Sequence, residues 1–281
     1  MSLSDLSSPA EAGFAKAGNR LAPSESKFGA GFFGIMRLGC RGNWPCIDHR
    51  RALAAPAMPA HTIVFDLDGT LIDTAPDLID TLNVVFAREG LPQVAYLTAR
   101  NLIGGGARAM IARGIETEGR VVEPAKLEQM FADFIAHYSA HIADRSQPFP
   151  GLIDALDVLA GRGCQFAVCT NKLERLSVLL LEELKIAGRF EAICGQDTFG
   201  VQKPDPEILR RTIMAAGGNL QRAIMIGDSA TDIRTARAAG VPVIAVDFGY
   251  SERPVSEFGP DRVISQFAQL PAAITAIFSA Q

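Results

Sequence analysis

Acidic residues follow two short apolar runs of this 281-residue chain, at positions where strands would end. Asp66 and Asp68 come after the first run, and Asp228 and Asp232 come after the second. The carboxyl ends of parallel strands meet at one edge of a sheet, so we expect these side chains to lie together. Carboxylates that converge in this way repel one another unless a cation lies among them, and their oxygens suit Mg²⁺. The pattern therefore predicts a magnesium site.

A hydroxyl, an amide and a lysine accompany these carboxylates. Thr170 and Asn171 follow another apolar run, and Lys203 stands in a loop before a helix. One lysine and a hydroxyl–amide pair beside Mg²⁺ form a site suited to phosphate. In such a site Asp66 can attack phosphorus, and Asp68 can exchange protons with the leaving oxygen and with water. Alone, the Asp-Gly-Thr string that starts at Asp68 is explained equally well as a simple turn.

Short apolar strands alternate with helices over most of the chain. Strands are predicted at 62–65, 165–169, 223–226, 241–246 and 262–264, and helices at 151–163, at 173–186, after Asp205-Pro206 and from Ser229 to Gly240. This alternation predicts an α/β fold with a doubly wound parallel sheet, a Rossmann-like core. Residues 75–147 show helical periodicity only. We therefore expect an inserted all-helical domain at 75–147 and a core built from 61–74 and 148–281.

Residues 1–60 differ from the rest of the chain in composition. They carry a net charge of +3, with seven glycines and five prolines, and they show no sustained period of either kind. Their acidic residues argue against a transit peptide, and residues 1–9 lack the basic start and apolar stretch of a secretory signal. We interpret residues 1–60 as a disordered extension or a non-native start, with Met58 as the alternative first residue.

The composition excludes several classes of protein. The net charge is −4 for the whole chain and −7 for residues 61–281, which argues against a nucleic-acid partner. The longest nearly uncharged apolar run, 29–36, is too short to span a bilayer, so no membrane partner is expected. Five cysteines without a known disulfide framework indicate a reducing compartment, and we predict a cytoplasmic protein. The sequence makes no prediction of the oligomeric state.

Four strings at the predicted strand ends carry a resemblance to a known family. Residues 65–74 (FDLDGTLIDT) resemble the first motif of the haloacid dehalogenase-like hydrolase superfamily, and residues 168–172 (VCTNK) resemble its second. Residues 203–206 (KPDP) are similar to the third motif, and residues 227–232 (GDSATD) to the fourth. The motifs occur in the family's order, and the resemblance covers about residues 61–275.

The resemblance implies a role for each of these polar residues. Asp66 would be the nucleophile that forms an aspartyl-phosphate, and Asp68 would be the general acid and base. Mg²⁺ would be bound by Asp66, by the backbone carbonyl of Asp68 and by Asp228, while Asp232 would bind it or orient a water on it. The phosphoryl group would be bound by Thr170, the amide of Asn171 and Lys203.

The helical insertion resembles the mobile cap of the superfamily, which excludes water and contacts the substrate. Its residues 102–108 (LIGGGAR) resemble the cap loop of phosphoglycolate phosphatases. The amides of Gly105 and Gly106 can hold an anion there, and Arg108 can bind a substrate carboxylate with two hydrogen bonds. The alternative is a glycine hinge beside a solvated Arg108. Gly105 departs from the family's usual string, in which asparagine is frequent, so the substrate contacts of this loop stay open.

The residues and the resemblance together indicate a Mg²⁺-dependent phosphatase of a small phosphorylated metabolite, with 2-phosphoglycolate as the first candidate. The alternative substrate is a sugar or amino-sugar phosphate. A phosphomutase and a non-catalytic phosphoryl-binding protein are further alternatives. The last is disfavoured because every acid and lysine of the four motifs is present.

Overall fold

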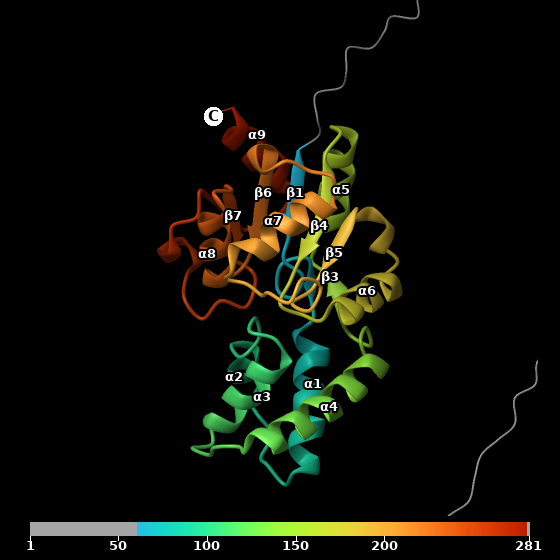
Figure 1. Cartoon of the computed structure of the whole chain (residues 1–281), viewed down its shortest axis with the longest axis vertical. Coiled ribbons are helices and arrows are strands. Elements are labelled where there is room, and N and C mark those ends of the chain that lie inside the picture. Colours follow the sequence, from blue (N-terminus) through green and yellow to red (C-terminus); the bar gives the residue numbers. More distant parts are fainter. Residues whose placement is uncertain (1–60, 280–281) are drawn as a thin grey trace, which may run out of the picture. The chain divides into compact units, whose positions relative to one another are not determined.

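The computed structural model describes residues 61–279, and its core is a six-stranded sheet (Figure 1). The strands are β1 (Thr62–Phe65), β4 (Gln165–Cys169), β5 (Ala192–Cys194), β6 (Ala223–Gly227), β7 (Val243–Val246) and β8 (Arg262–Ile264). They lie in the order β5-β4-β1-β6-β7-β8, and all neighbours are parallel. The predicted parallel α/β sheet is confirmed, whereas the prediction for residues 1–60 lies outside the described residues.

Side chains of each strand alternate between two apolar cores, one on each face of the sheet. Ile63 and Phe65 belong to the core that contains α5 (Leu152–Gly161), α6 (Glu174–Glu183) and α9 (Leu270–Phe278). Val64 belongs to the other core, with α7 (Pro206–Ala215) and α8 (Ala230–Ala239). Because both faces are buried, the strands appear in the sequence as continuous apolar runs. The doubly wound arrangement is therefore confirmed.

Strand β1 lies between β4 and β6, and the three strands run in register. Phe65, the last residue of β1, is opposite Val168 on one side and Ile226 on the other. Residues that follow these strand ends therefore emerge next to one another at one edge of the sheet. This register is what gathers the polar residues that follow three separate strands.

Local signals fix the ends of α7 and α8. The Asp205 carboxylate accepts a hydrogen bond from the amide of Glu207 at 2.9 Å and caps α7, as its sequence predicts. Ser229 and Asp232 form a reciprocal capping box at the start of α8. Gly240 ends that helix with a φ of 74°, in the left-handed region that favours glycine. The position of Asp232 is thus set by the way the helix begins.

An all-helical insertion lies between β2 (Ile72–Asp73) and β3 (Gln147–Pro148), as the sequence predicts. Its helices are α1 (Ala75–Arg88), α2 (Tyr96–Arg100), α3 (Ala107–Glu116) and α4 (Pro124–Ala140). Strands β2 and β3 pair antiparallel, with Asp73 opposite Gln147. The two places where the chain passes between sheet and insertion are therefore side by side.

Sequence patterns gave no indication of β2, β3, β5, α2 or α9. The first four have five residues or fewer, which is too short for a hydrophobic period to appear. Helix α9 has one polar residue, Thr275, and so shows no amphipathic period.

None of the helices within residues 61–279 is long and apolar enough to cross a membrane.

A buried carboxylate joins the two passages between sheet and insertion. Asp77, in the first turn of α1, accepts hydrogen bonds from the Ser146 amide at 2.7 Å and from the Ser146 hydroxyl at 2.6 Å. It also accepts one from the Arg145 amide at 3.1 Å, and it is 3% exposed. Buried donors without an acceptor cost free energy, so Asp77 fixes the path of the chain where it leaves the insertion.

We expect Asp77→Ala to lower the free energy of unfolding by about 2–4 kcal/mol, because it leaves buried donors of Ser146 unpaired. Asp80→Ala is the matched control on the same helix. The Asp80 side chain is 61% exposed and pairs with Arg145, and surface ion pairs contribute only about 0–1 kcal/mol. Urea denaturation followed by circular dichroism measures both values. Equal losses in the two variants would contradict the role of Asp77.

Candidate active site

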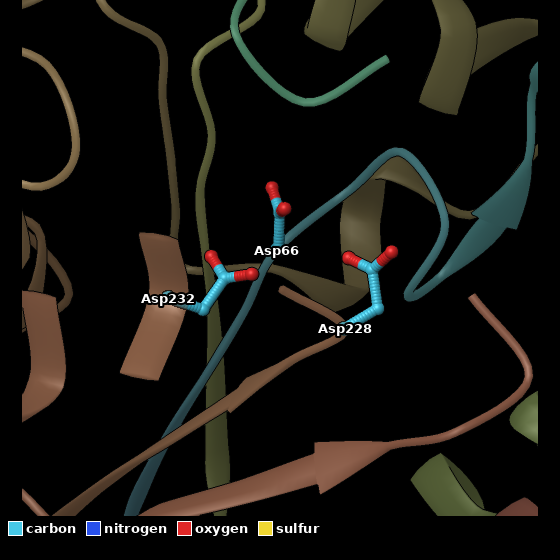
Figure 2. A group of neighbouring side chains, drawn as sticks. All are labelled: Asp66, Asp228 and Asp232. Carbon is cyan, nitrogen blue, oxygen red and sulfur yellow. The ribbon is translucent and has the colours of Figure 1, made fainter. Parts of the chain in front are cut away.

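Three buried carboxylates meet at the carboxyl edge of the sheet (Figure 2). Asp66 follows β1, Asp228 follows β6, and Asp232 lies in the first turn of α8. One oxygen of each lies within 4.8 Å of the others. The sequence-based expectation that these acids lie together therefore agrees with their geometry.

These carboxylates cannot all remain ionised without positive charge near them. Burial raises the pKa of Asp66 above its ordinary value, and the charge of Asp232 adds to that rise, although Lys203 opposes it. Burial also raises the pKa of Asp228, and the charges of Asp232 and Asp66 raise it further. A group of buried oxygen donors in this state has the chemistry of a site for a hard divalent cation.

Two close contacts with glycine backbone and two hydrogen bonds hold the Asp228 side chain. Its oxygens accept from the Thr70 hydroxyl at 3.1 Å and from the Tyr250 amide at 2.7 Å. Gly69 and Gly249 pack against it so closely that a methyl group on either would lie 2.5 Å from Oδ2 or 2.2 Å from Cβ, respectively. The tight fit explains glycine at both positions, and sequence reasoning gave no role to Tyr250.

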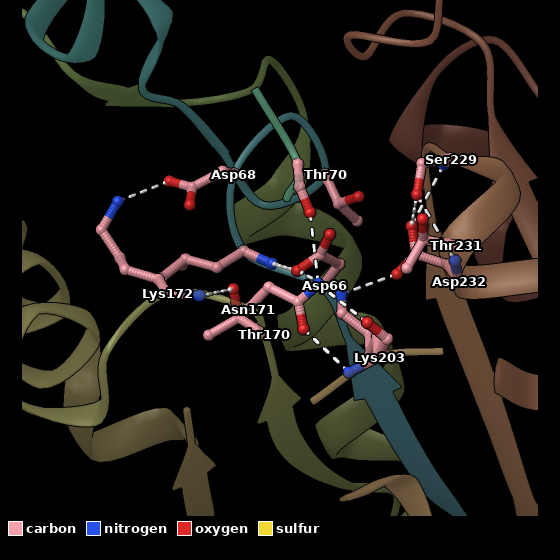
Figure 3. A network of polar contacts seen from close by, with 12 residues as sticks. Asp66, Asp68, Thr70, Thr170, Asn171, Lys172, Lys203, Ser229, Thr231 and Asp232 are labelled. Carbon is pink, nitrogen blue, oxygen red and sulfur yellow. Dashed lines mark hydrogen bonds and ion pairs between the residues drawn. The ribbon is translucent and has the colours of Figure 1, made fainter. Parts of the chain in front are cut away.

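Lys203 lies between two of the acids (Figure 3). Its ammonium is 2.8 Å from Asp66 Oδ1 and 2.7 Å from Asp232 Oδ1, and its side chain is 2% exposed. Burial alone would lower the pKa of Lys203, but the charges of Asp232 and Asp66 raise it above the ordinary value. Lys203 is therefore a fixed positive charge that contacts Asp66.

Asp232 and Asn171 position this lysine. The second oxygen of Asp232 accepts from the Ser229 hydroxyl at 2.6 Å, so both of its oxygens are in hydrogen bonds. The Asn171 side chain accepts from the Lys203 amide at 2.9 Å and donates to the Lys203 carbonyl at 3.1 Å. The side chain of Asn171 thus holds the lysine loop, a function that sequence reasoning did not assign to it.

Thr170 and Asn171 follow β4 and line a small cavity of about 40 Å³ next to Asp66. The Thr170 hydroxyl accepts from the Lys172 amide at 3.2 Å. The backbone amide of Asn171 donates to no residue in the described part of the chain. A free amide beside a buried carboxylate and a lysine is suited to an anionic oxygen.

Asp68 lines the same cavity, but its carboxylate is turned to another partner. Its Oδ1 accepts from the Thr74 hydroxyl at 2.7 Å and from the Lys172 ammonium at 2.8 Å. Figure 3 shows this carboxylate pointing toward Lys172 rather than toward Asp66. The structure therefore brings Asp68 to the cavity without adding its carboxylate to the acidic cluster.

The opposite wall of the cavity comes from the helical insertion. Gly104 and Gly106 of the loop before α3 contribute to it with Ala107, the first residue of α3, and apolar side chains of α4, among them Phe134 and Tyr138, complete the wall. Gly106 has a φ of 83°, and a methyl group there would lie 3.1 Å from the Asn171 carbonyl oxygen. Gly106 thus lets the loop approach the core closely, whereas the role of its amide in holding an anion stays a prediction.

Gly105 and Arg108 do not line this cavity, although the sequence predicts that they meet the substrate. Gly105 lines an adjoining opening together with Arg113 and Lys203. Arg108 makes two hydrogen bonds to Glu128 of α4, at 2.7 and 2.9 Å, and its side chain is 48% exposed. The pairing of α3 with α4 thus holds Arg108 outside the cavity lining, and its role toward the substrate stays a prediction.

Comparisons of sequence and of structure with known proteins find phosphatases and hydrolases. The sequence model of the family described as haloacid dehalogenase-like hydrolase matches residues 63–246. The chain is 49% identical to a phosphoglycolate phosphatase of Mesorhizobium japonicum, over 74% of this chain and 92% of the relative. It is 44% identical to one of Caulobacter vibrioides, over 75% and 90%. Among solved structures it is similar to a predicted phosphoglycolate phosphatase from Haemophilus somnus, with a TM-score of 0.72 and 25% identity over 76% of this chain and 98% of that one.

We expect Gly249→Ala to weaken Mg²⁺ binding at least about tenfold, which corresponds to about 1.4 kcal/mol. The added methyl group would lie 2.2 Å from Asp228 Cβ, so Asp228 must move out of the acidic cluster. Gly161→Ala, where the new methyl group meets nothing within 4 Å, is the control. Isothermal titration with MgCl₂ measures both affinities. Unchanged affinity in Gly249→Ala would show that the position of Asp228 does not matter for the cation.

Proposed function

The chain belongs to the haloacid dehalogenase-like hydrolase family, and from this membership we propose that it is a phosphatase that hydrolyses 2-phosphoglycolate to glycolate and phosphate. One observation carries the proposal: Asp66 is a buried carboxylate that lines a small cavity and is paired with a buried lysine. Relatives named phosphoglycolate phosphatase, at 49% and 44% identity, support the choice of substrate.

In the first step an oxygen of Asp66 attacks phosphorus. A bond forms between this oxygen and phosphorus, and the bond from phosphorus to the glycolate oxygen breaks. Protonated Asp68 gives its proton to the departing oxygen, so glycolate leaves as the alcohol. Lys203, 2.8 Å from Asp66, offsets negative charge on the reacting oxygens. The step leaves an aspartyl-phosphate on Asp66.

In the second step water attacks the phosphorus of the aspartyl-phosphate. The carboxylate of Asp68 takes a proton from this water, and the bond from phosphorus to Asp66 breaks. Phosphate leaves, and Asp66 and protonated Asp68 are restored. The Thr170 hydroxyl and the free amide of Asn171 would hold phosphoryl oxygens in both steps, since phosphoryl transfer depends mainly on positioning and charge.

Mg²⁺ would be held by Asp66, Asp228 and the backbone carbonyl of Asp68. The buried oxygen donors fit this ion, because their mutual repulsion calls for a cation and because Mg²⁺ prefers oxygen ligands. When bound, the ion supplies positive charge to the phosphoryl oxygens. Both oxygens of Asp232 are in hydrogen bonds with Lys203 and Ser229, so we assign Asp232 the role of orienting a water on the ion.

The apolar wall of the cavity favours a compact substrate over a sugar or amino-sugar phosphate. The side chains that α4 contributes to the lining are apolar apart from the Tyr138 hydroxyl, so this wall offers no row of hydrogen-bonding side chains for sugar hydroxyls.

We also propose a cytoplasmic location, which the buried free thiols of Cys169 and Cys194 support.

We expect Asp66→Asn to lower kcat by more than about 1000-fold, because the amide cannot form the acyl-phosphate. Asp80→Asn is the control, since Asp80 is exposed on α1 and does not line the cavity. Rates come from the release of inorganic phosphate, and thermal melting checks the fold of both variants. Robust hydrolysis by Asp66→Asn would rule out Asp66 as the nucleophile.

With Mg²⁺ present, the wild-type protein is expected to rank 2-phosphoglycolate above glucose 6-phosphate and glucosamine 6-phosphate in kcat/KM. EDTA should stop turnover of every substrate, and added MgCl₂ should restore it, because the buried acids need the ion's charge. A sugar phosphate at the top of the ranking would replace the proposed substrate. Full activity in EDTA would contradict the role of Mg²⁺.

A further inference from the structure

Lys172 is a buried cation in the cavity for which the proposed mechanism has no use. It follows Thr170 and Asn171 at the end of β4, and its side chain is 5% exposed. Its ammonium lies 2.8 Å from Asp68 Oδ1. Among residues 61–279, Asp68 is the only carboxylate paired with it. Burying a lysine ammonium costs free energy unless an anion pairs with it.

The charge of Lys172 is maintained by its partner. Both side chains of the pair are buried, with Lys172 5% exposed and Asp68 14% exposed. A cation in this position needs a negative group next to it. If Asp68 turned away, another anion would have to take its place.

Tyr138 of α4 faces the same part of the cavity from the insertion. Its ring centroid is 4.6 Å from the Lys172 ammonium, and Tyr138 is fully buried. Its hydroxyl donates a hydrogen bond to no residue in the part of the chain that the structure describes. Burial raises the pKa of Tyr138 to about 12, so the hydroxyl keeps its proton and can donate. A buried donor without an acceptor beside a buried cation matches an anionic ligand group.

Two donors hold the Asp68 carboxylate. Thr74 and Lys172 both donate to Oδ1, and the carboxylate points toward Lys172 (Figure 3). In the proposed mechanism the same carboxylate must reach the leaving oxygen on a phosphoryl group bound at Asp66. The contact with Lys172 must therefore break, and the freed carboxylate must take a proton from solvent, before Asp68 can act as the acid; it returns this proton when the contact forms again.

We propose that Lys172 and the Tyr138 hydroxyl bind the substrate's second anionic group, a carboxylate, and that this binding releases Asp68 for proton transfer. The inference rests on the proposed function and deepens it. One carboxylate replaces another on Lys172, so the buried ammonium is never left unpaired. A phosphate ester without a second negative group cannot pair with the Lys172 ammonium, so Asp68 remains hydrogen-bonded to the lysine. Specificity for a carboxylated substrate and the readiness of the acid thus depend on one residue.

The test compares 2-phosphoglycolate with its neutral amide, 2-phosphoglycolamide, which has nearly the same shape. Lys172→Met is expected to lower the ratio of kcat/KM for the acid over the amide at least about 100-fold, because the cation that distinguishes them is gone. Lys126→Met is the matched control. Lys126 pairs with Glu89 on the surface and does not line the cavity, so the ratio should stay at the wild-type value.

Tyr138→Phe provides a second variant that removes one unpartnered hydroxyl and keeps the packing. It should raise KM for 2-phosphoglycolate about fivefold with little change in kcat, and lower the ratio accordingly. Thermal melting shows whether each variant is folded. If Lys172→Met does not fold, Tyr138→Phe decides, and an unchanged KM overturns the anion subsite.

The outcomes separate this inference from the proposed function. If the wild type prefers 2-phosphoglycolate to the amide and Lys172→Met keeps that preference, the inference is wrong and the proposed substrate stands. An equal loss of kcat/KM on both compounds also overturns it, because Lys172 would then only support the fold of the site. If the wild type shows no preference for the acid, the carboxylate subsite fails, while the proposed substrate is still decided by its ranking against the sugar phosphates.

Discussion

The contact of Lys203 with two buried carboxylates is the constraint around which the site is built. Burying Asp66 and Asp232 within one acidic cluster is unfavourable unless a positive charge lies between them, and Lys203 supplies it at 2.8 and 2.7 Å. Each participant depends on a separate element: the end of β1, the capping box of α8, and a loop held by the Asn171 side chain. The register of β1 with β4 and β6 is what lets these elements meet at one point.

A single loop connects the acidic cluster with the insertion. The Tyr250 amide donates to Asp228, while its hydroxyl donates to Asp73 and accepts from the Ala75 amide, where α1 begins. Arg100 of α2 donates to the carbonyl oxygens of the two residues before Tyr250, at 3.1 and 2.5 Å. A movement of α2 or of the start of α1 would therefore act on the loop that positions Asp228. This loop is a physical connection between the insertion and the predicted metal ligands.

The sequence predicts the parts of this protein that depend on local pattern. Asp66, Thr170 and Asp228 could be found because each follows an apolar run long enough to be read as a strand. Residues whose role depends on tertiary contacts could not be found in this way. Tyr138 lies in an apolar helical stripe like any core aromatic residue, and only the fold brings it to Lys172. The pairing of Arg108 with Glu128 could not be predicted either, since Glu128 lies 20 residues away on the next helix.

The distribution of charge decides how a protein with a negative net charge can accept an anionic substrate. Residues 61–281 carry a net charge of −7, so a favourable potential for a phosphate must be local. The two buried lysines of the site cannot supply it unaided, because both are already neutralised: Lys203 by two acids and Lys172 by Asp68. Positive charge can come from a cation on the acidic cluster and from Lys172 once Asp68 departs from it. A substrate with two anionic groups can use both sources at once, one at each end of the molecule, and a substrate with one anionic group can use only the first.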